Sequence, residues 1–405
     1  MFKKMMRSYD YSLIIVYILL CLFGLVMIYS ASMVTAVQKY GYESDYFYNK
    51  QLINIIIGFL AFICAAFFPY KAFKFNKLLK ILMLSILGLL VAVHFIGSEV
   101  NNAQSWIDLG FMSIQPSEFA KLAIIIYLAA VYAKKQDYIN TLNKGVAPPL
   151  IFLMLICGLV AVEPDFGTAG IIFVIGMIII SCSGISGKTF LKLGTMAAIL
   201  FLLVSPVIFF LRDYIFTKER MSRLEAYVDP FLYAKDDGYH LVNSYLAIGG
   251  GGIQGLGLGQ SIQKLGYLPE SHTDFIMAVI AEELGVFGVS FVIVGLSYIV
   301  LRGIYIGVKC TDPFGTMLAI GISGMIGLQS FINLGGVSGL IPITGVPLPF
   351  VSYGGSSLLV LSLSMGMLVN VSMFVKYEGN NKYKKENDRP LSNSSKQKVY
   401  NFNSK

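Results

Sequence analysis

Apolar residues in this chain fall into ten long runs separated by short polar segments. Most runs are about 17–25 residues long, the length at which a helix rising ~1.5 Å per residue crosses a hydrocarbon layer of ~30 Å. The pattern therefore predicts an all-α polytopic membrane protein with about ten transmembrane helices. We expect them near residues 11–31, 52–68, 78–96, 116–133, 146–162, 167–183, 190–211, 274–300, 314–338 and 352–375.

Composition agrees with a lipid environment. Of the 405 residues, 56% are hydrophobic and 13% are charged, and the mean hydropathy is +0.70. A soluble domain could not bury that much apolar surface. The cysteines lie inside the apolar runs or at an inner edge, without paired spacing on the outer side, so we expect neither a disulfide nor a metal cluster. They are Cys21, Cys64, Cys157, Cys182 and Cys310.

Basic residues gather on one side of the predicted helices. Most of the 31 Lys and Arg lie on the side of both chain ends, whereas the short segments of the other side hold only Lys39, Lys50 and Lys121. The positive-inside rule therefore places both termini in the cytoplasm and one long loop, residues 212–273, outside between the seventh and eighth helices. The net charge of +8 then reflects topology and contact with anionic lipid, and no nucleic-acid partner is expected.

The chain divides into a transmembrane domain and a tail. Residues 1–375 form the transmembrane domain, which includes the long outer loop. Residues 376–405 are polar and rich in Lys, Asn and Ser. This composition predicts a disordered basic tail in the cytoplasm.

Ionisable residues beside apolar helices are functional candidates because burying them is unfavourable. In the segment 103–121, Pro116 occupies a favoured first-turn position, and Glu118 and Lys121 share a helix face. One interpretation is an internal ion pair that locks the helix end. The other is that Lys121 faces an outer cavity and binds an anion, with Trp106 as an interfacial or stacking residue.

The turn from Glu163 to Thr168 places two carboxylates, Glu163 and Asp165, close together between two apolar runs. Such groups can raise each other's pKa or share a cation. A solvated turn in which Asp165 caps the next helix is the alternative.

The long outer loop carries Arg220 and Arg223, which lie on one face if this segment is helical. Arginines so placed suit a phosphate or diphosphate, although solvated charge is the ordinary alternative. The glycine run from Gly249 to Gly259 would let backbone N–H groups approach an anion, or it forms a flexible re-entrant turn. It is not a Walker loop, because no Gly-Lys-Ser/Thr comes after it.

Asp274 is the strongest single candidate, because it stands where the long outer loop enters an apolar helix. Burial there would raise its pKa toward neutral pH, which suits a general base, whereas a helix N-terminal carboxylate is the structural alternative. His272 is either a second proton carrier or a hydrogen-bonding spacer. The Pro- and Gly-rich segment from Gly339 to Ser357 predicts a non-helical path that lines a cavity or is covered by protein.

At these residues the chain resembles the SEDS proteins of bacterial cell-wall synthesis, the group of FtsW, RodA and SpoVE, and is most similar to the FtsW branch. The resemblance spans nearly the whole apolar region. It is carried by the WIDLG and QPSEFAK segment, the EPDFGTA turn, YLPESHTDF with the adjoining AEELG, and PITGVPLPFVSYGGSS. One departure is that Gln104 and Ser105 stand where the family often has a basic residue before the Trp.

The resemblance implies a peptidoglycan glycosyltransferase of the bacterial cytoplasmic membrane that polymerises lipid II on the outer face during division. Its implied partners are a class B penicillin-binding protein, the nascent glycan strand and other proteins of the division septum. Asp274 matches the family's essential outer-loop aspartate, and Trp106, Glu118, Lys121 and Asp165 match other positions of functional weight. No nucleotide is needed, because the lipid-linked diphosphate is already activated.

In the mechanism we expect, Asp274 takes the proton from the acceptor hydroxyl, while Lys121, Arg220 and Arg223 stabilise the leaving diphosphate. A divalent cation, Mg²⁺ or Mn²⁺, is a further candidate for that task. Two alternatives stay open. A lipid II flippase would need a similar cavity, but would more naturally show internal repeats, and none is clear here. A non-catalytic division scaffold would leave the outer-loop residues without a role.

Overall fold

The computed structural model describes residues 6–100, 103–108, 110, 113–196, 198, 218–236 and 238–387. Within them the predicted all-helical membrane architecture is confirmed, with eight helices long and apolar enough to cross a membrane and one shorter apolar helix. The long helices are α2 (Tyr11–Tyr40), α3 (Tyr46–Phe67), α4 (Asn76–Ile96), α5 (Pro116–Lys134), α6 (Ala147–Val162), α12 (Ile276–Lys309), α13 (Pro313–Val337) and α14 (Gly355–Asn387). Helix α6 reaches spanning length because it continues the π-helical turn before it, which together give 21 residues, Leu142–Val162. The shorter apolar helix is α7 (Phe166–Cys182).

The seventh predicted helix, near 190–211, falls mostly outside the described residues. Residues 187–196 and 198 are helical, whereas residues 197 and 199–217 are not described. The next described element, α10 (Lys218–Val228), already belongs to the predicted outer loop.

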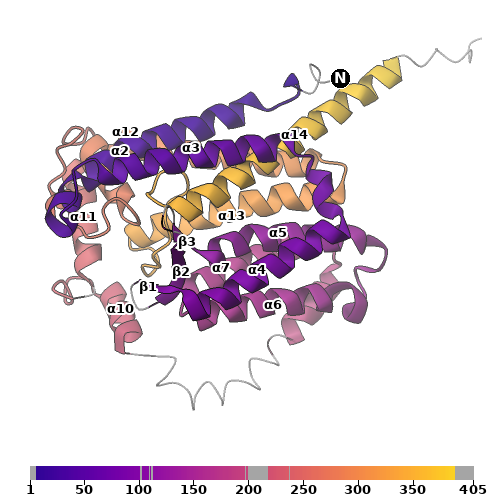
Figure 1. The fold of residues 1–405 in the computed structure, drawn as a ribbon, viewed down its shortest axis with the longest axis horizontal. Coiled ribbons are helices and arrows are strands. Elements are labelled where there is room, and N and C mark those ends of the chain that lie inside the picture. The colour runs from indigo at the N-terminus through magenta and orange to yellow at the C-terminus, as the bar shows by residue number, and fades with distance from the viewer. Residues whose placement is uncertain are drawn as a thin grey trace, which may run out of the picture.

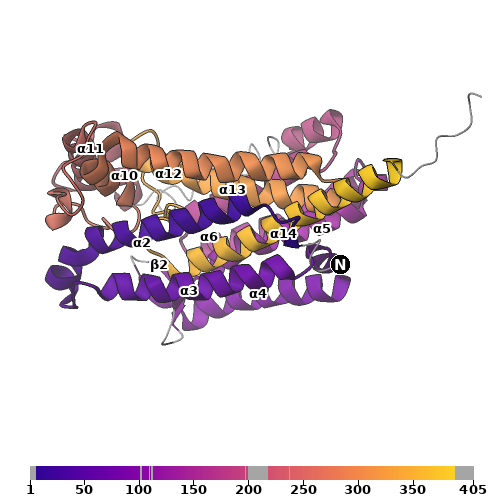
Figure 2. The same ribbon diagram turned by 90° about the horizontal axis from the view of Figure 1, so that it is seen from above.

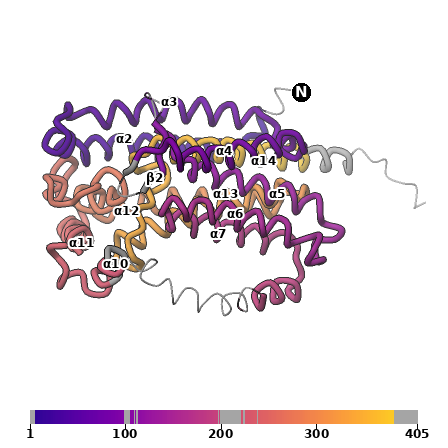
Figure 3. Tube along the Cα trace, turned by 60° about the horizontal axis from the view of Figure 1, so that its bottom comes forward, coloured from indigo at the N-terminus to yellow at the C-terminus, as the bar shows by residue number. Residues whose placement is uncertain are grey.

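The helices are arranged in three tiers (Figures 1 and 3). Helices α2 and α3 form one side, α5, α6 and α7 form the other, and α13 and α14 lie between them. Helix α14 packs against α3, while α13 packs against α5, α7 and α12. The central tier therefore packs against helices on both of its sides.

Both described chain ends lie at the same end of the bundle, opposite α10 and α11 (Tyr239–Gly251) (Figure 2). We call it the inner end, and the opposite one the outer end. Ion pairs at the inner end join elements far apart in sequence, since Arg302 Nε lies 2.8 Å from Asp10 Oδ2 and Lys71 Nζ lies 3.1 Å from Glu378 Oε1. The predicted even number of spans agrees with this arrangement, because it places both chain ends on one side.

The outer end carries more regular structure than the sequence indicated. Between α4 and α5 the chain forms a small antiparallel sheet in the order β1 (Ser98–Val100), β2 (Ala103–Asp108), β3 (Ser113–Ile114). The long outer loop contains the helices α10 and α11 and a short 3-10 helix, η4 (Gln263–Leu265). Further short turns link the helices at the inner end, η1 (Tyr70–Lys74), η2 (Gln136–Tyr138) and η3 (Leu142–Val146).

Several helices run past their predicted ends. Helix α2 ends at Tyr40 instead of near 31, α12 at Lys309 instead of near 300, and α14 at Asn387 instead of near 375. The first part of the predicted tail is therefore helical, while residues 388–405 lie outside the described residues. Hydropathy marks only the part of a helix that contacts lipid, whereas the backbone hydrogen bonds of the helix continue into the polar residues beyond it.

Helix α12 is broken at Gly285, where φ is 59° and ψ is −150°. Carbonyls next to the break are taken up by the segment that comes after α11. Leu256 N–H donates to the Glu282 carbonyl and Gly257 N–H to the Glu283 carbonyl, each at 2.9 Å. Backbone groups that lose their helical partners at the break are thus hydrogen-bonded to another part of the chain.

The glycine run allows this close approach. At Gly255, where φ is +78°, an added Cβ would lie 2.3 Å from the Glu283 carbonyl oxygen. The N–H groups of Leu256 and Gly257 are already bonded to α12. Of the two interpretations of Gly249–Gly259, the structure therefore favours the re-entrant turn over an anion cradle, and the turn is held in place.

A buried ion pair fixes the same region. Lys264 Nζ lies 2.7 Å from Glu283 Oε1 and 2.9 Å from Ser30 Oγ on α2, and both charged residues are 1% exposed or less. The neighbouring Glu282 accepts from Ser261 Oγ and from Ile262 N–H. The segment that leads to Asp274 is therefore anchored to α2 and to the first half of α12.

Candidate active site

The chain between α13 and α14, residues 338–354, re-enters the helix bundle without forming a helix or strand. Leu348, Phe350 and Val351 on it are buried. Val351 lies against the middle of α2, where a Cβ added to Gly24 would be 2.7 Å from the Val351 Cα. The predicted non-helical path covered by protein is confirmed.

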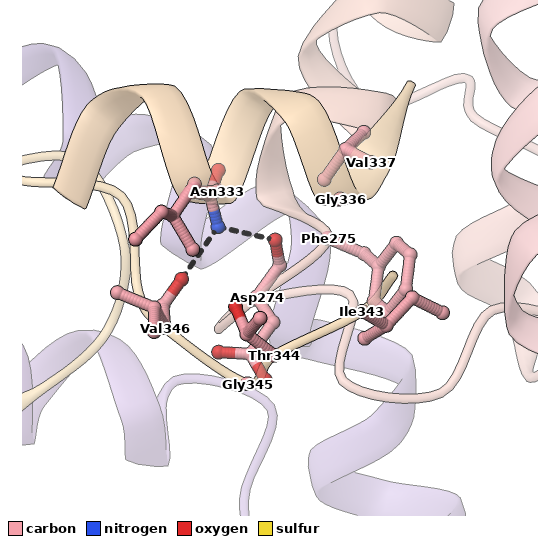
Figure 4. A pocket seen from close by; sticks show the side chains of 10 residues that line it. Asp274, Phe275, Asn333, Gly336, Val337, Ile343, Thr344, Gly345 and Val346 are labelled. Carbon is pink, nitrogen blue, oxygen red and sulfur yellow. Dashed lines mark hydrogen bonds between the residues drawn. The ribbon is translucent and has the colours of Figure 1, made fainter. Parts of the chain in front are cut away.

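This re-entrant segment and Asp274 line one small pocket at the outer end (Figure 4). The remaining lining comes from α13 and from Phe275. Gly345, where φ is +72°, faces the carboxylate, since a Cβ there would lie 3.6 Å from Asp274 Oδ2. The residues that line the pocket are Asp274, Phe275, Ile332, Asn333, Gly336, Val337, Ile343, Thr344, Gly345 and Val346.

Asp274 stands two residues before α12 begins at Ile276, as the sequence predicted. Burial raises the pKa of its carboxyl to about 7, and the negative charge of Glu270 acts in the same direction. The side chain of Asp274 is thus poised to exchange a proton near neutral pH, which is the property a general base needs.

Glu270 forms the turn that presents Asp274. Its φ is 55°, and its carbonyl accepts from the N–H groups of Thr273 and Phe275, each at 3.2 Å. Its carboxylate accepts from Thr273 Oγ1 at 2.9 Å and lies 3.7 Å from Lys39 Nζ. Sequence reasoning overlooked both Glu270 and Asn333, although Glu270 lies in the same motif as Asp274.

His272 is buried between two aromatic rings, with ring centroids 4.4 Å from Phe47 and 5.6 Å from Tyr353. Burial lowers its pKa to about 4, so the ring is neutral at neutral pH. Its main-chain carbonyl accepts from Tyr353 N–H at 3.0 Å. This placement favours the spacer interpretation of His272 over the second proton carrier.

Glu118 and Lys121 form the internal ion pair that was one of the two interpretations. Lys121 Nζ lies 2.6 Å from Glu118 Oε1, and the residues are 1% and 4% exposed. The second oxygen, Glu118 Oε2, has no hydrogen-bond partner among the described residues. In this structure the positive charge of Lys121 is therefore matched within α5.

Two expected features of the turn from Glu163 to Thr168 are both present: Asp165 caps the next helix, and one carboxylate affects the pKa of the other. Asp165 Oδ1 accepts from Thr168 N–H at 3.0 Å, which caps α7, and Asp165 Oδ2 accepts from Gln115 Nε2 at 3.3 Å. Burial raises the pKa of Glu163 to about 8, and the charge of Asp165 acts in the same direction. Sequence reasoning noted the pair but did not single out Glu163 as the buried member.

The remaining candidates are placed only in part. Trp106 is half-buried in β2, where its carbonyl accepts from Ser98 Oγ at 3.2 Å. Arg220 and Arg223 lie three residues apart on α10, as expected for one helix face, but their side chains lie outside what the structure describes.

Within the part of the chain that the structure describes, no group of three or more His, Cys, Asp or Glu side chains is arranged to hold a metal ion. At the turn before α7, Asp165 accepts hydrogen bonds from Thr168 N–H and Gln115 Nε2, while burial raises the pKa of Glu163.

Comparison with known proteins gives a consistent result. The family described as "Cell cycle protein", FtsW/RodA/SpoVE, matches residues 10–377. A protein of Bacillus subtilis (strain 168) named "Probable peptidoglycan glycosyltransferase FtsW" is 60% identical over 385 residues, which cover 95% of each chain. The "Stage V sporulation protein E" of the same organism is 38% identical over 378 residues, covering 91% of this chain and 98% of its own.

Solved structures share the fold. A chain from "Structural coordination of polymerization and crosslinking by a peptidoglycan synthase complex" superposes with a TM-score of 0.69 at 24% identity, covering 91% of this chain and 98% of its own. The Rod shape determining protein RodA of Thermus thermophilus gives a TM-score of 0.62 at 24% identity, covering 90% and 96%. With matches over nearly its whole length, this multi-pass membrane protein belongs to the SEDS family of FtsW, RodA and SpoVE.

Proposed function

We propose that this chain is a peptidoglycan glycosyltransferase that polymerises lipid II into β-1,4-linked glycan on the outer face of the bacterial cytoplasmic membrane. The observation that carries the proposal is Asp274, whose pKa of about 7 fits a base in a pocket at the outer end. The name of the Bacillus subtilis relative supports the reaction class.

In the proposed reaction Asp274 removes the proton from the 4-hydroxyl of the acceptor GlcNAc. The oxygen attacks the anomeric carbon of the donor MurNAc from the side opposite the diphosphate. A carbon–oxygen bond to the acceptor forms, the bond to the diphosphate oxygen breaks, and the configuration inverts. The proton remains on Asp274 and the electron pair leaves with undecaprenyl diphosphate.

The leaving diphosphate needs positive charge in a site of low dielectric. Arg220 and Arg223 on α10 and Lys121 on α5 are the proposed sources. Lys121 contributes only if its 2.6 Å contact with Glu118 is loosened when substrate enters. A divalent cation, Mg²⁺ or Mn²⁺, is an alternative source, for which the diphosphate itself would have to supply ligands.

The proposed setting is cell division. The Bacillus subtilis relative is named as an FtsW protein, and the solved structure with TM-score 0.69 comes from a peptidoglycan synthase complex. We infer that this chain works at the division septum with a class B penicillin-binding protein and other division proteins, and that both termini lie in the cytoplasm.

The decisive experiment is glycan polymerisation from purified lipid II by the protein with its cognate penicillin-binding protein. The partner's transpeptidase is blocked with a β-lactam, and wild type is compared with Asp274→Asn. Long strands from the wild type and none from a folded, partner-bound variant are expected. Polymer from both would remove Asp274 from the mechanism. Polymer from neither, with a competent partner and substrate, would favour lipid II transport.

A further inference from the structure

Glu163, directly after the last residue of α6, carries a buried carboxyl group. It is 2% exposed, and neither of its carboxylate oxygens has a hydrogen-bond partner among the described residues. Its main-chain carbonyl accepts from Ser105 Oγ at 3.3 Å, so the backbone is fixed while the carboxyl group is left unsatisfied. An ionised carboxylate in such a place is strongly unfavourable, and the neutral acid is the form that burial selects.

The charged groups around Glu163 also favour its neutral form. Asp165, on the same turn, raises the pKa of Glu163. On α5, which packs beside α6, the charges of Glu118 and Lys121 are paired with each other at 2.6 Å. Among the side chains that the structure describes, His94 on α4 and the exposed Asp108 on β2 are further titratable groups at the outer ends of neighbouring elements. None of the described cations therefore compensates an ionised Glu163.

A neutral carboxylic acid has an O–H group to donate, and buried donors in folded proteins have acceptors. Two further buried oxygens at the start of α5, Ser117 Oγ and Glu118 Oε2, also have no partner among the described residues. Unsatisfied polar groups thus gather at the outer ends of α5 and α6. This is the arrangement expected where a polar ligand completes the hydrogen bonding.

The turn that carries Glu163 adjoins the Asp274 pocket. A Cβ added to Gly167 would lie 3.5 Å from the Thr344 carbonyl oxygen, and Thr344 lines that pocket. The same turn begins α7, a helix of 17 residues whose N-terminal end carries positive partial charge. The start of α7 is already capped by Asp165 and the carboxyl oxygens of Glu163 are buried, so a diphosphate bound at Asp274 reaches Glu163 only when this turn opens to admit it.

On the basis of the proposed function, we propose that Glu163, as a neutral acid, donates a hydrogen bond to a phosphate oxygen of the lipid-linked diphosphate. Ionised Glu163 would repel that anion and has no proton to donate. Binding of the diphosphate is thereby coupled to protonation of this side chain. Glu163 then selects for a diphosphate at the turn before α7, and it takes no part in the proton transfer at Asp274.

The test measures the affinity of the full-length protein for undecaprenyl diphosphate as a function of pH, on an Asp274→Asn background that cannot turn over. With Glu163 present, the affinity should fall ~10-fold from pH 7 to pH 9, as its neutral fraction falls through a pKa of about 8. Adding Glu163→Gln, which keeps an N–H donor and cannot ionise, should flatten that slope. Glu43→Gln, an exposed carboxylate on another outer loop, is the matched control.

The outcomes separate the two proposals. No diphosphate binding by any variant at any pH would sink the proposed function. Binding with an unchanged slope in Glu163→Gln would overturn the role of Glu163 alone. Undecaprenol, which lacks phosphate, should show no pH dependence. If Glu163→Gln does not fold, proton uptake on binding is measured at pH 8.5, well above a phosphate pKa of ~6, and no uptake would refute the proposal.

Discussion

Asn333 on α13 holds the Asp274 segment and the re-entrant segment together. Its Nδ2 donates to the Asp274 carbonyl and to the Val346 carbonyl, each at 2.8 Å. One neutral side chain thus joins the residue that carries the proposed base to the chain that forms the opposite wall of the pocket (Figure 4). The geometry of the pocket depends on a residue that takes no part in the chemistry.

Replacing Asn333 with Ala should lower glycan polymerisation ~10–100-fold, because small displacements of a catalytic group have large effects on rate. Unfolding free energy should fall by ~1–3 kcal/mol, since two buried carbonyls lose their donor. Ser330→Ala is the control, because the hydroxyl of Ser330 donates to the Ile326 carbonyl of its own helix. Equal polymerisation rates in the two variants would contradict a positioning role for Asn333.

Polymerisation should depend on pH through Asp274. A base must be ionised, so activity is lost as pH falls through the pKa of about 7. Burial is the main cause of that value and the charge of Glu270 is the second, so Glu270→Gln should move the acid limb to lower pH. The measurement is the rate from pH 5.5 to 8.5 for both proteins. An unmoved limb would show that the charge of Glu270 does not reach Asp274.

The pair Glu118–Lys121 allows a test of its two interpretations. Either single change, Lys121→Met or Glu118→Leu, leaves one buried charge unpaired and should destabilise the protein by ~3–5 kcal/mol, while the double variant should recover most of that loss. If Lys121 also binds the diphosphate, the double variant stays inactive although it is stable. A stable and active double variant would show that the pair is structural. Thermal unfolding in detergent and polymerisation are measured in parallel.

Two glycines in the turn after α11, which contacts the break in α12, allow a matched comparison. Gly255 and Gly259 have φ values of +78° and +82°, but only at Gly255 would a Cβ meet the backbone of α12. Gly259→Ala should lose ~1–2 kcal/mol from backbone strain alone. Gly255→Ala should lose clearly more and lower the melting temperature further. Similar melting temperatures would mean that the turn moves away from α12 without difficulty.

Much of the fold could be predicted from the sequence because lipid imposes length and polarity on each span. The runs at 78–96, 116–133, 146–162 and 167–183 match α4, α5, α6 and α7 closely. The ends of α2, α12 and α14 could not be predicted, since those helices continue where the hydropathy signal stops. The helices α10 and α11 were also missed, because a polar or Gly-rich segment resembles a loop when its packing partners are unknown.

For the candidate site, the sequence predicted the position of Asp274 and the covered path of the segment after α13. It could not choose between alternatives that depend on contacts across the fold. Lys121 forms an ion pair within α5, and N–H groups of the glycine run donate hydrogen bonds to carbonyls of α12. Glu163 is more deeply buried than Asp165, and the sequence of a turn does not show which of two nearby carboxylates is the buried one.

The break at Gly285 separates two environments along one helix. Residues before it, from Ile276 to Glu283, are buried, whereas Phe287, Val294 and Leu301 beyond it are largely exposed on the face available to lipid. Bilayer thickness acts on exposed apolar helices by changing their tilt. A tilt of the second half can be absorbed at the break, so polymerisation rates should vary little across bilayers of different acyl-chain length. A steep dependence on chain length would show that the two halves move as one.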